Sequence, residues 1–137
     1  MTVPLWCLLA FAAWTVGLVF SVITWRSVMV LRGIKQANEF MAGVPHGPDL
    51  YWRLNRAHMN AVENLTVFGA IVLVAHAAGV NGGMFAQLAQ VYVGARVVQS
   101  IAHVTSNAVG VVYVRFSALV VQLACAAGMI GIVVASR

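Results

Sequence analysis

Polar side chains recur at helical spacing inside a stretch of the sequence that is otherwise apolar. The first such stripe consists of Arg53, Arg56, Asn60 and Glu63. Residues three or four positions apart lie on the same face of an α-helix, so these four side chains are expected to share one face. Guanidinium, amide and carboxylate groups on one face can bind a polar ligand or hydrogen-bond to a neighbouring helix.

Two later segments carry similar stripes. One consists of Arg96, Gln99 and His103, and the other pairs Arg115 with Gln122. Each set again falls on one face of a helix. Three separate segments are therefore expected to bring polar faces together.

The arginines of these stripes outnumber their one carboxylate, because Glu63 stands against Arg53, Arg56, Arg96 and Arg115. Such a cationic cluster favours an anionic ligand, and Arg binds a carboxylate through two parallel hydrogen bonds. Two plainer interpretations stay open. In the first, the residues of the stripes only form hydrogen bonds that hold the helices together. In the second, Glu63 forms an internal ion pair with one of the arginines.

The sequence lacks the residue patterns of a metal site and of a nucleic-acid-binding surface. The spacing of His46, His58, His76 and His103 is not that of a metal site, and neither cysteine lies near a histidine in the sequence. We therefore predict no metal site. The basic residues form no run that is interleaved with aromatic residues, so no nucleic-acid partner is expected.

The composition indicates an integral membrane protein. Hydrophobic residues make up 62% of the 137-residue chain and charged residues only 8%. Soluble domains have about 45–50% apolar and about 25% charged residues. So few charges cannot cover the surface of a soluble chain of this size, whereas a surface in lipid can be as apolar as the core.

The charges and the Gly- and Pro-containing breaks divide the chain into four apolar segments. Each is long enough to cross about 30 Å of hydrocarbon as a helix. The expected fold is all-α: one membrane-spanning domain, a bundle of four transmembrane helices at about residues 4–31, 50–79, 84–104 and 109–136.

Lysine and arginine are concentrated in and beside the connection between the first two segments. Positively charged connections stay in the cytoplasm. The first and third connections are therefore predicted to be cytoplasmic, and both termini extracytoplasmic. We expect a multi-pass protein of a bacterial inner membrane.

The run from residue 53 to 64 resembles the signature of the MAPEG family, the membrane-associated proteins in eicosanoid and glutathione metabolism. The family pattern reads roughly R-A-H-x-N-x-x-E at the start of the second helix. Five residues match it: Arg56, Ala57, His58, Asn60 and Glu63. The run 94–103 is similar to a second family marker on the third helix. The resemblance covers nearly the whole chain.

The resemblance implies a homotrimer that binds glutathione, as co-substrate, between neighbouring subunits on the cytoplasmic side. It implies that Arg56, Asn60 and Glu63 hold glutathione and that Arg115 is the catalytic residue beside its sulfur. The predicted glutathione site also includes the motif residue His58 and four further residues of the stripes, Arg53, Arg96, Gln99 and His103. The second substrate would be a lipophilic electrophile or a lipid hydroperoxide dissolved in the membrane lipid.

The sequence departs from the family pattern at three places. Met59 follows the motif histidine, where many glutathione-using members have a basic residue. Members that make eicosanoids carry tyrosines on the third and fourth helices. Here His103 stands at the position on the third helix, and Arg115 is followed by Phe116 and not by a tyrosine. These departures favour a second hypothesis, a non-catalytic lipid-binding or scaffold protein of the same fold. In that case Arg115 could simply mark the cytoplasmic end of its helix among lipid headgroups.

Overall fold

The computed structural model describes residues 1–41 and 43–136, and these form four long helices and no strand. The helices are α1 (Val3–Leu31), α2 (Asp49–Ala77), α3 (Gly83–Thr105) and α4 (Val109–Ala135), with a short 3₁₀ turn, η1 (Ala37–Glu39), between α1 and α2. Their ends lie within two residues of the ranges expected from the sequence. The predicted all-α fold with four helices is thus confirmed.

Two helices end where a glycine takes up a left-handed conformation. Gly33 follows α1 with φ +67° and Gly79 follows α2 with φ +78°. After α2, the amide of Gly79 donates to the carbonyl of His76, and the amide of Val80 donates to that of Ala75. This pair of bonds satisfies carbonyls that the helix leaves without partners, and glycine permits it because it has no Cβ. Both turns are therefore set locally by the sequence.

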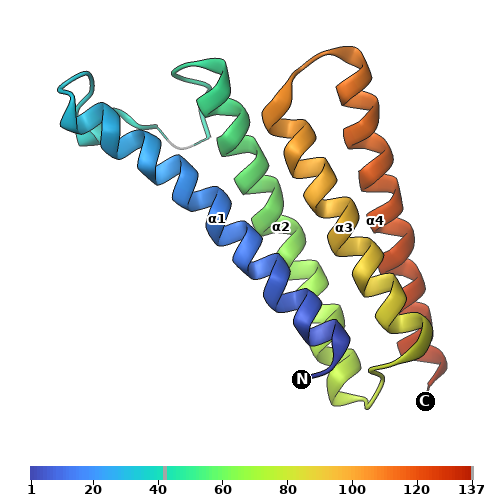
Figure 1. Cartoon of the computed structure of the whole chain (residues 1–137). Coiled ribbons are helices and arrows are strands. Elements are labelled where there is room, and N and C mark those ends of the chain that lie inside the picture. The colour runs from blue at the N-terminus through green and yellow to red at the C-terminus, as the bar shows by residue number, and fades with distance from the viewer. Residues whose placement is uncertain (42, 137) are drawn as a thin grey trace.

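The four helices run up and down beside one another (Figure 1). Both termini and the α2–α3 turn lie at one end of the bundle, and the α1–α2 and α3–α4 connections lie at the other. The N-terminus is tied to the α2–α3 turn by the hydroxyl of Thr2, which donates to Asn81 Oδ1 over 3.5 Å. The polar stripes lie in the halves of α2, α3 and α4 that are nearer the α1–α2 and α3–α4 connections, so they can meet toward that end of the bundle.

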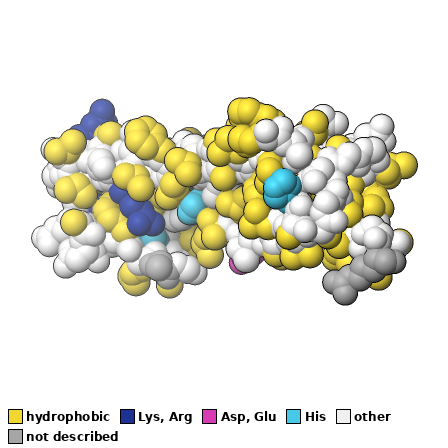
Figure 2. Space-filling view, turned by 90° about the horizontal axis from the view of Figure 1, so that it is seen from below, with side chains coloured by type: hydrophobic (Ala, Val, Ile, Leu, Met, Phe, Trp, Pro, Cys, Tyr) yellow, Lys and Arg dark blue, Asp and Glu magenta, His cyan; other side chains and the backbone are white. Residues whose placement is uncertain are grey.

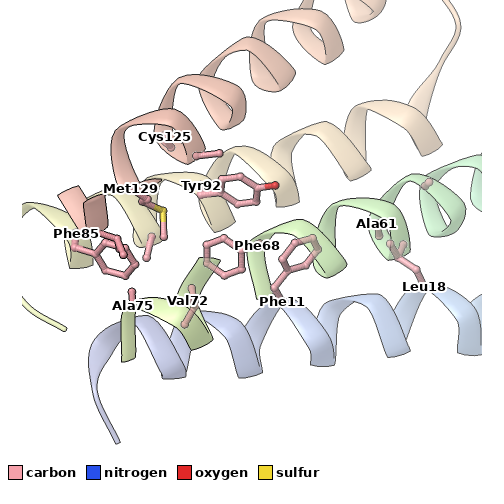
Figure 3. Packing of buried hydrophobic residues seen from close by; sticks show 14 residues of the cluster. Phe11, Leu18, Ala61, Phe68, Val72, Ala75, Phe85, Tyr92, Cys125 and Met129 are labelled. Carbon is pink, nitrogen blue, oxygen red and sulfur yellow. The ribbon is translucent and has the colours of Figure 1, made fainter. Parts of the chain in front are cut away.

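Aromatic rings and small residues fill the centre of the bundle (Figure 3). Phe11 of α1 packs against Phe68 of α2 at 5.9 Å between ring centroids, and Phe68 stacks on Tyr92 of α3 at 4.6 Å. Alanines such as Ala61 and Ala75 are fully buried and let the helix backbones approach closely. The core thus fixes α1, α2 and α3 against one another directly beside the polar stripes.

The outer surface is compatible with lipid. Three of the described helices, α1, α2 and α4, are long and apolar enough to cross a membrane. The polar stripe of α3, with Arg96, Gln99 and His103, lowers the hydropathy of that helix, but Arg96 and Gln99 are buried in the bundle. Large apolar side chains such as Phe20 and Leu123 are exposed on the helices. Figure 2 views the molecule from below, toward the end with both termini, and in that view the Lys and Arg side chains appear only at the left.

The orientation in the membrane remains a prediction, and labelling of single cysteines tests it. In a background without Cys7 and Cys125, Gly82→Cys in the α2–α3 turn should react with a membrane-impermeant maleimide in intact cells. Val44→Cys, in the α1–α2 connection, should react only after permeabilisation. Both positions are exposed, and the expectation follows from the concentration of lysine and arginine beside Val44. The reverse labelling pattern would contradict the orientation.

Candidate functional site

Arg96 of α3 lies in the interior of the bundle, with only 1% of its surface exposed. Its NH1 donates to Gln99 Oε1 at 2.6 Å and to Gln122 Oε1 at 3.3 Å, and its NH2 donates to Asn60 Oδ1 at 2.7 Å. The partners come from α2, α3 and α4. All three are neutral amide oxygens, and within the part of the chain that the structure describes no acidic side chain forms a salt bridge with Arg96.

Two glutamines extend this network toward α4. Gln122 Nε2 donates to Gln99 Oε1 at 2.9 Å and to the carbonyl of Ala118 at 3.0 Å. Gln99 Nε2 donates to the carbonyl of Arg115 at 3.1 Å. The three predicted stripes therefore do meet, and hydrogen bonds between helices, one of the interpretations left open by the sequence, account for part of them.

Arg115 points into the protein and is 9% exposed. Its NH1 contacts His103 Nδ1 at 3.2 Å, and its NH2 donates to the carbonyl of Ser106 at 3.2 Å and to Asn107 Oδ1 at 3.4 Å. Its Nε is buried and has no hydrogen-bond partner among the described residues. Such burial is not that of a side chain spread among lipid headgroups, so the structure disfavours that interpretation of Arg115.

The contact between Arg115 and His103 also indicates which ring nitrogen of the histidine carries the proton. A guanidinium can only donate, so Nδ1 of His103 must accept and the proton of the neutral ring lies on Nε2. His103 therefore has an N–H group available on the far side of its ring.

A cleft of about 520 Å³ opens beside Arg115, between α2, α3 and α4. This volume lies within the range of small-ligand sites, roughly 300–1,000 Å³. Polar residues line it on all three helices and apolar residues close it on α4. The lining consists of Arg56, Asn60, Gln99, His103, Asn107, Val112, Arg115, Phe116 and Leu119.

A second, smaller hollow of about 250 Å³ adjoins the cleft and shares Arg56, Asn60 and His103 with it. Glu63 lines this second hollow, together with Gly43, Trp52 and Met59. Arg56 and Glu63 are both exposed, and no salt bridge joins Glu63 to an arginine within the described residues. The structure of the single chain thus does not contain the internal ion pair that the sequence left open.

Three of the predicted glutathione-binding residues lie off the walls of these two hollows. Arg96 is buried behind Asn60, as described above. Arg53 Nε donates to the carbonyl of Val104 at 2.9 Å and thereby joins α2 to the last turn of α3. His58 is half-buried and lines neither hollow. The other predicted residues, Arg56, Asn60, Glu63, Gln99, His103 and Arg115, all line one or both.

Some of the lining residues were not predicted from the sequence. Asn107 lies in the connection between α3 and α4 and reaches the guanidinium of Arg115. Phe116 and Leu119 form part of the apolar wall on α4. Asn107 belongs to no helical stripe, so only its position in the connection directly before α4 could have indicated it.

The arrangement can bind a small anion with a polar body. Two guanidinium groups, of Arg56 and Arg115, line one cleft, and the one carboxylate of the site, Glu63, lies in the adjoining hollow. Such donors act more strongly in a low-dielectric site than in water. Phe116 and Leu119 add an apolar wall against which a lipid-soluble compound can lie.

Comparisons with known proteins bear on the whole chain. No curated protein matches it. The model of the MAPEG family matches residues 3–135, from the first turn of α1 to the end of α4. Because the match spans almost the full length and agrees with the four-helix bundle, the chain belongs to the MAPEG family.

Proposed function

We propose that this protein is a glutathione-dependent membrane transferase or peroxidase that acts on lipophilic electrophiles or lipid hydroperoxides. Membership of the MAPEG family supports a glutathione-related membrane function in general terms. The observation that carries the proposal of catalysis is Arg115, a nearly buried arginine that lines the cleft and whose Nε has no hydrogen-bond partner among the described residues.

The chemistry of the two hollows fits glutathione, which carries two carboxylates, one ammonium group and a thiol. Arg56 pairs with a carboxylate, Asn60 donates an amide hydrogen bond, and Glu63 pairs with the ammonium group. The charged partners are complementary in sign, and hydrogen bonds to charged groups contribute about 1.5–3 kcal/mol each. Arg115 lines the same cleft from α4, and we assign it to the sulfur.

The position of Glu63 supports an assembly of several subunits. Glu63 lies 14 residues from each end of α2 and is exposed on the single chain. A carboxylate that faces lipid at the middle of the bilayer costs about 2.5–3.5 kcal/mol on insertion scales. A neighbouring subunit that covers the α2 stripe removes this exposure, and a closed ring gives equivalent sites. We propose that this ring is a homotrimer, as the resemblance to the family pattern implies.

Native mass spectrometry tests the assembly. In mild detergent we expect the mass of three chains of 14.6 kDa. Glu63→Gln should retain the trimer, because the substitution keeps the shape and removes only the charge. Monomers of the unmutated protein across several detergents and lipids would contradict the proposed site between subunits.

The reaction would begin with the thiolate of glutathione. A thiol with a pKa near ~8.5 is mostly protonated at neutral pH. A guanidinium close to the sulfur stabilises the anion and lowers that pKa, and one pKa unit needs only about 1.4 kcal/mol. A guanidinium group supplies a fixed positive charge, and in this proposal Arg115 provides it. The N–H group of His103 can donate to the same sulfur.

The thiolate then reacts with the lipid-soluble substrate. With an electrophile, sulfur forms a bond to carbon and a leaving group departs with the electron pair. With a hydroperoxide, sulfur attacks the outer oxygen and the O–O bond breaks, giving the alcohol after protonation and a sulfenic acid. A second glutathione converts the sulfenic acid to glutathione disulfide and water. Phe116 and Leu119 offer the apolar surface for the second substrate.

Activity of the purified protein in detergent separates this function from a non-catalytic one. We expect glutathione conjugation to a model aryl halide, or reduction of a lipid hydroperoxide, at rates well above those of buffer and of heat-denatured protein. Binding of glutathione without either reaction would favour the scaffold or lipid-binding hypothesis that Met59 and the missing tyrosine raise.

A further inference from the structure

We infer that Arg96 is a positioning residue, which fixes the amide of Asn60 so that its nitrogen faces the glutathione site. The inference rests on the proposed function. Arg96 itself lines neither the cleft nor the adjoining hollow, so its effect on a ligand has to pass through Asn60.

The direction of the Asn60 amide follows from the chemistry of its partner. The guanidinium of Arg96 has hydrogen-bond donors and no acceptor, so it must meet the oxygen of the amide. That oxygen lies 2.7 Å from Arg96 NH2. The Nδ2 group of Asn60 therefore points away from Arg96, and it forms no hydrogen bond within the described residues. Because Asn60 lines both hollows, Nδ2 is a donor available to a ligand there.

Arg96 is itself held in a single place. Gln99 Oε1 and Gln122 Oε1 accept from its NH1, and its guanidinium lies over the ring of Phe11 at 5.7 Å from the centroid. The two glutamines are tied in turn to each other and to backbone carbonyls of α4. A buried network in which each amide is bonded restricts rotation of its members. The 2.6 Å bond to Gln99 and the ring of Phe11 hold Arg96 against Asn60 without Gln122, whose own bond to Arg96 is longer at 3.3 Å.

Loss of Arg96 should remove the preference for the amide orientation in which Asn60 Nδ2 faces the cleft. Without the guanidinium, the amide of Asn60 can turn and present Oδ1 to the cleft, and an oxygen repels the carboxylate or carbonyl oxygen of a ligand. Lysine at position 96 keeps the charge but cannot supply the planar pair of donors that bonds Asn60 and Gln99 together. Both Arg96→Gln and Arg96→Lys should therefore weaken glutathione binding.

The test measures the dissociation constant of glutathione by calorimetry on the detergent-purified full chain. Arg96→Gln and Arg96→Lys should raise that constant about tenfold, the loss expected for one hydrogen bond to a charged group. The matched control is Gln122→Met, which removes another amide from the same network but leaves the Asn60 contact in place. It should lower the unfolding temperature and change the dissociation constant by less than about twofold.

Asn60→Asp provides a second variant that does not depend on the folding of Arg96 variants. A carboxylate at position 60 would form an ion pair with Arg96 and offer no donor to the cleft. We expect an unfolding temperature no lower than that of the unmutated protein, together with a roughly tenfold or greater loss of glutathione affinity. If Asn60 had only a structural role, the substitution would change the unfolding temperature and the glutathione affinity in the same direction.

The outcomes distinguish this inference from the proposed function. If the unmutated protein binds glutathione and Arg96→Gln binds it equally well, or if Asn60→Asp keeps full affinity, the positioning role is wrong and the proposed function stands. Equal losses of affinity in Arg96→Gln and Gln122→Met would also overturn it, because the effect would then be structural. Failure of the unmutated protein to bind glutathione would overturn both.

Discussion

Replacement of Arg115 by leucine should slow conjugation of glutathione to an aryl halide by about tenfold to a hundredfold at neutral pH. The reason is electrostatic, because the buried guanidinium beside the cleft would no longer stabilise the thiolate. A loss of about 1.4–2.8 kcal/mol corresponds to one or two units in the pKa of the bound thiol. Glutathione affinity should stay within a few-fold, since the peptide is held by α2.

Two further variants make the Arg115 result specific. Arg115→Lys retains a positive charge and should keep a larger part of the rate than Arg115→Leu. Arg32→Leu removes an exposed arginine directly after α1 that lies outside both hollows, and this variant should conjugate at the unmutated rate. Conjugation by Arg115→Leu at the unmutated rate from pH 6 to 8 would mean that another group stabilises the thiolate.

The second large effect is expected on binding. Arg56→Leu should raise the dissociation constant of glutathione by about tenfold to a hundredfold, because a charge-assisted hydrogen bond to a carboxylate contributes about 1.5–3 kcal/mol. Calorimetry on the purified protein measures this constant directly. Glu63→Gln should also weaken binding, since it removes the negative partner of the ammonium group. Arg32→Leu again serves as the control.

Arg56→Leu should weaken binding of glutathione without slowing the chemical step. At glutathione concentrations that saturate the variant, the rate of conjugation by Arg56→Leu should approach that of the unmutated protein. An unchanged dissociation constant with a reduced maximal rate would instead assign Arg56 to the chemistry and contradict the division of roles between α2 and α4.

The fold could be predicted closely because its signals are local. The distribution of charges marks where apolar helices begin and end, and Gly33 and Gly79 occupy the left-handed turns that terminate α1 and α2. The lower hydropathy of α3 arises from its polar stripe. Helical spacing indicates that these polar residues share one face. It does not indicate that this face points into the bundle rather than to lipid.

The site could be predicted only to the level of helix faces. Spacing puts Arg53, Arg56 and Asn60 on one stripe, yet it cannot tell which of them lines a cleft and which bonds to another helix. Arg53 bonds to the end of α3, and Arg96 is buried behind Asn60. Those outcomes depend on how the helices pack. Asn107 lies in a connection without periodicity, so no pattern indicated it.

One measurement tests the central claim most directly: the ultraviolet difference spectrum of the purified, unmutated protein titrated with glutathione at neutral pH. The account predicts a saturable thiolate absorbance, with a midpoint that matches the dissociation constant from calorimetry. S-methylglutathione, which cannot ionise at sulfur, should bind without that absorbance, and Arg115→Leu should bind glutathione with little of it. Saturable binding of glutathione by the unmutated protein with no thiolate absorbance would contradict the role of Arg115, and the absence of any binding would contradict glutathione use itself.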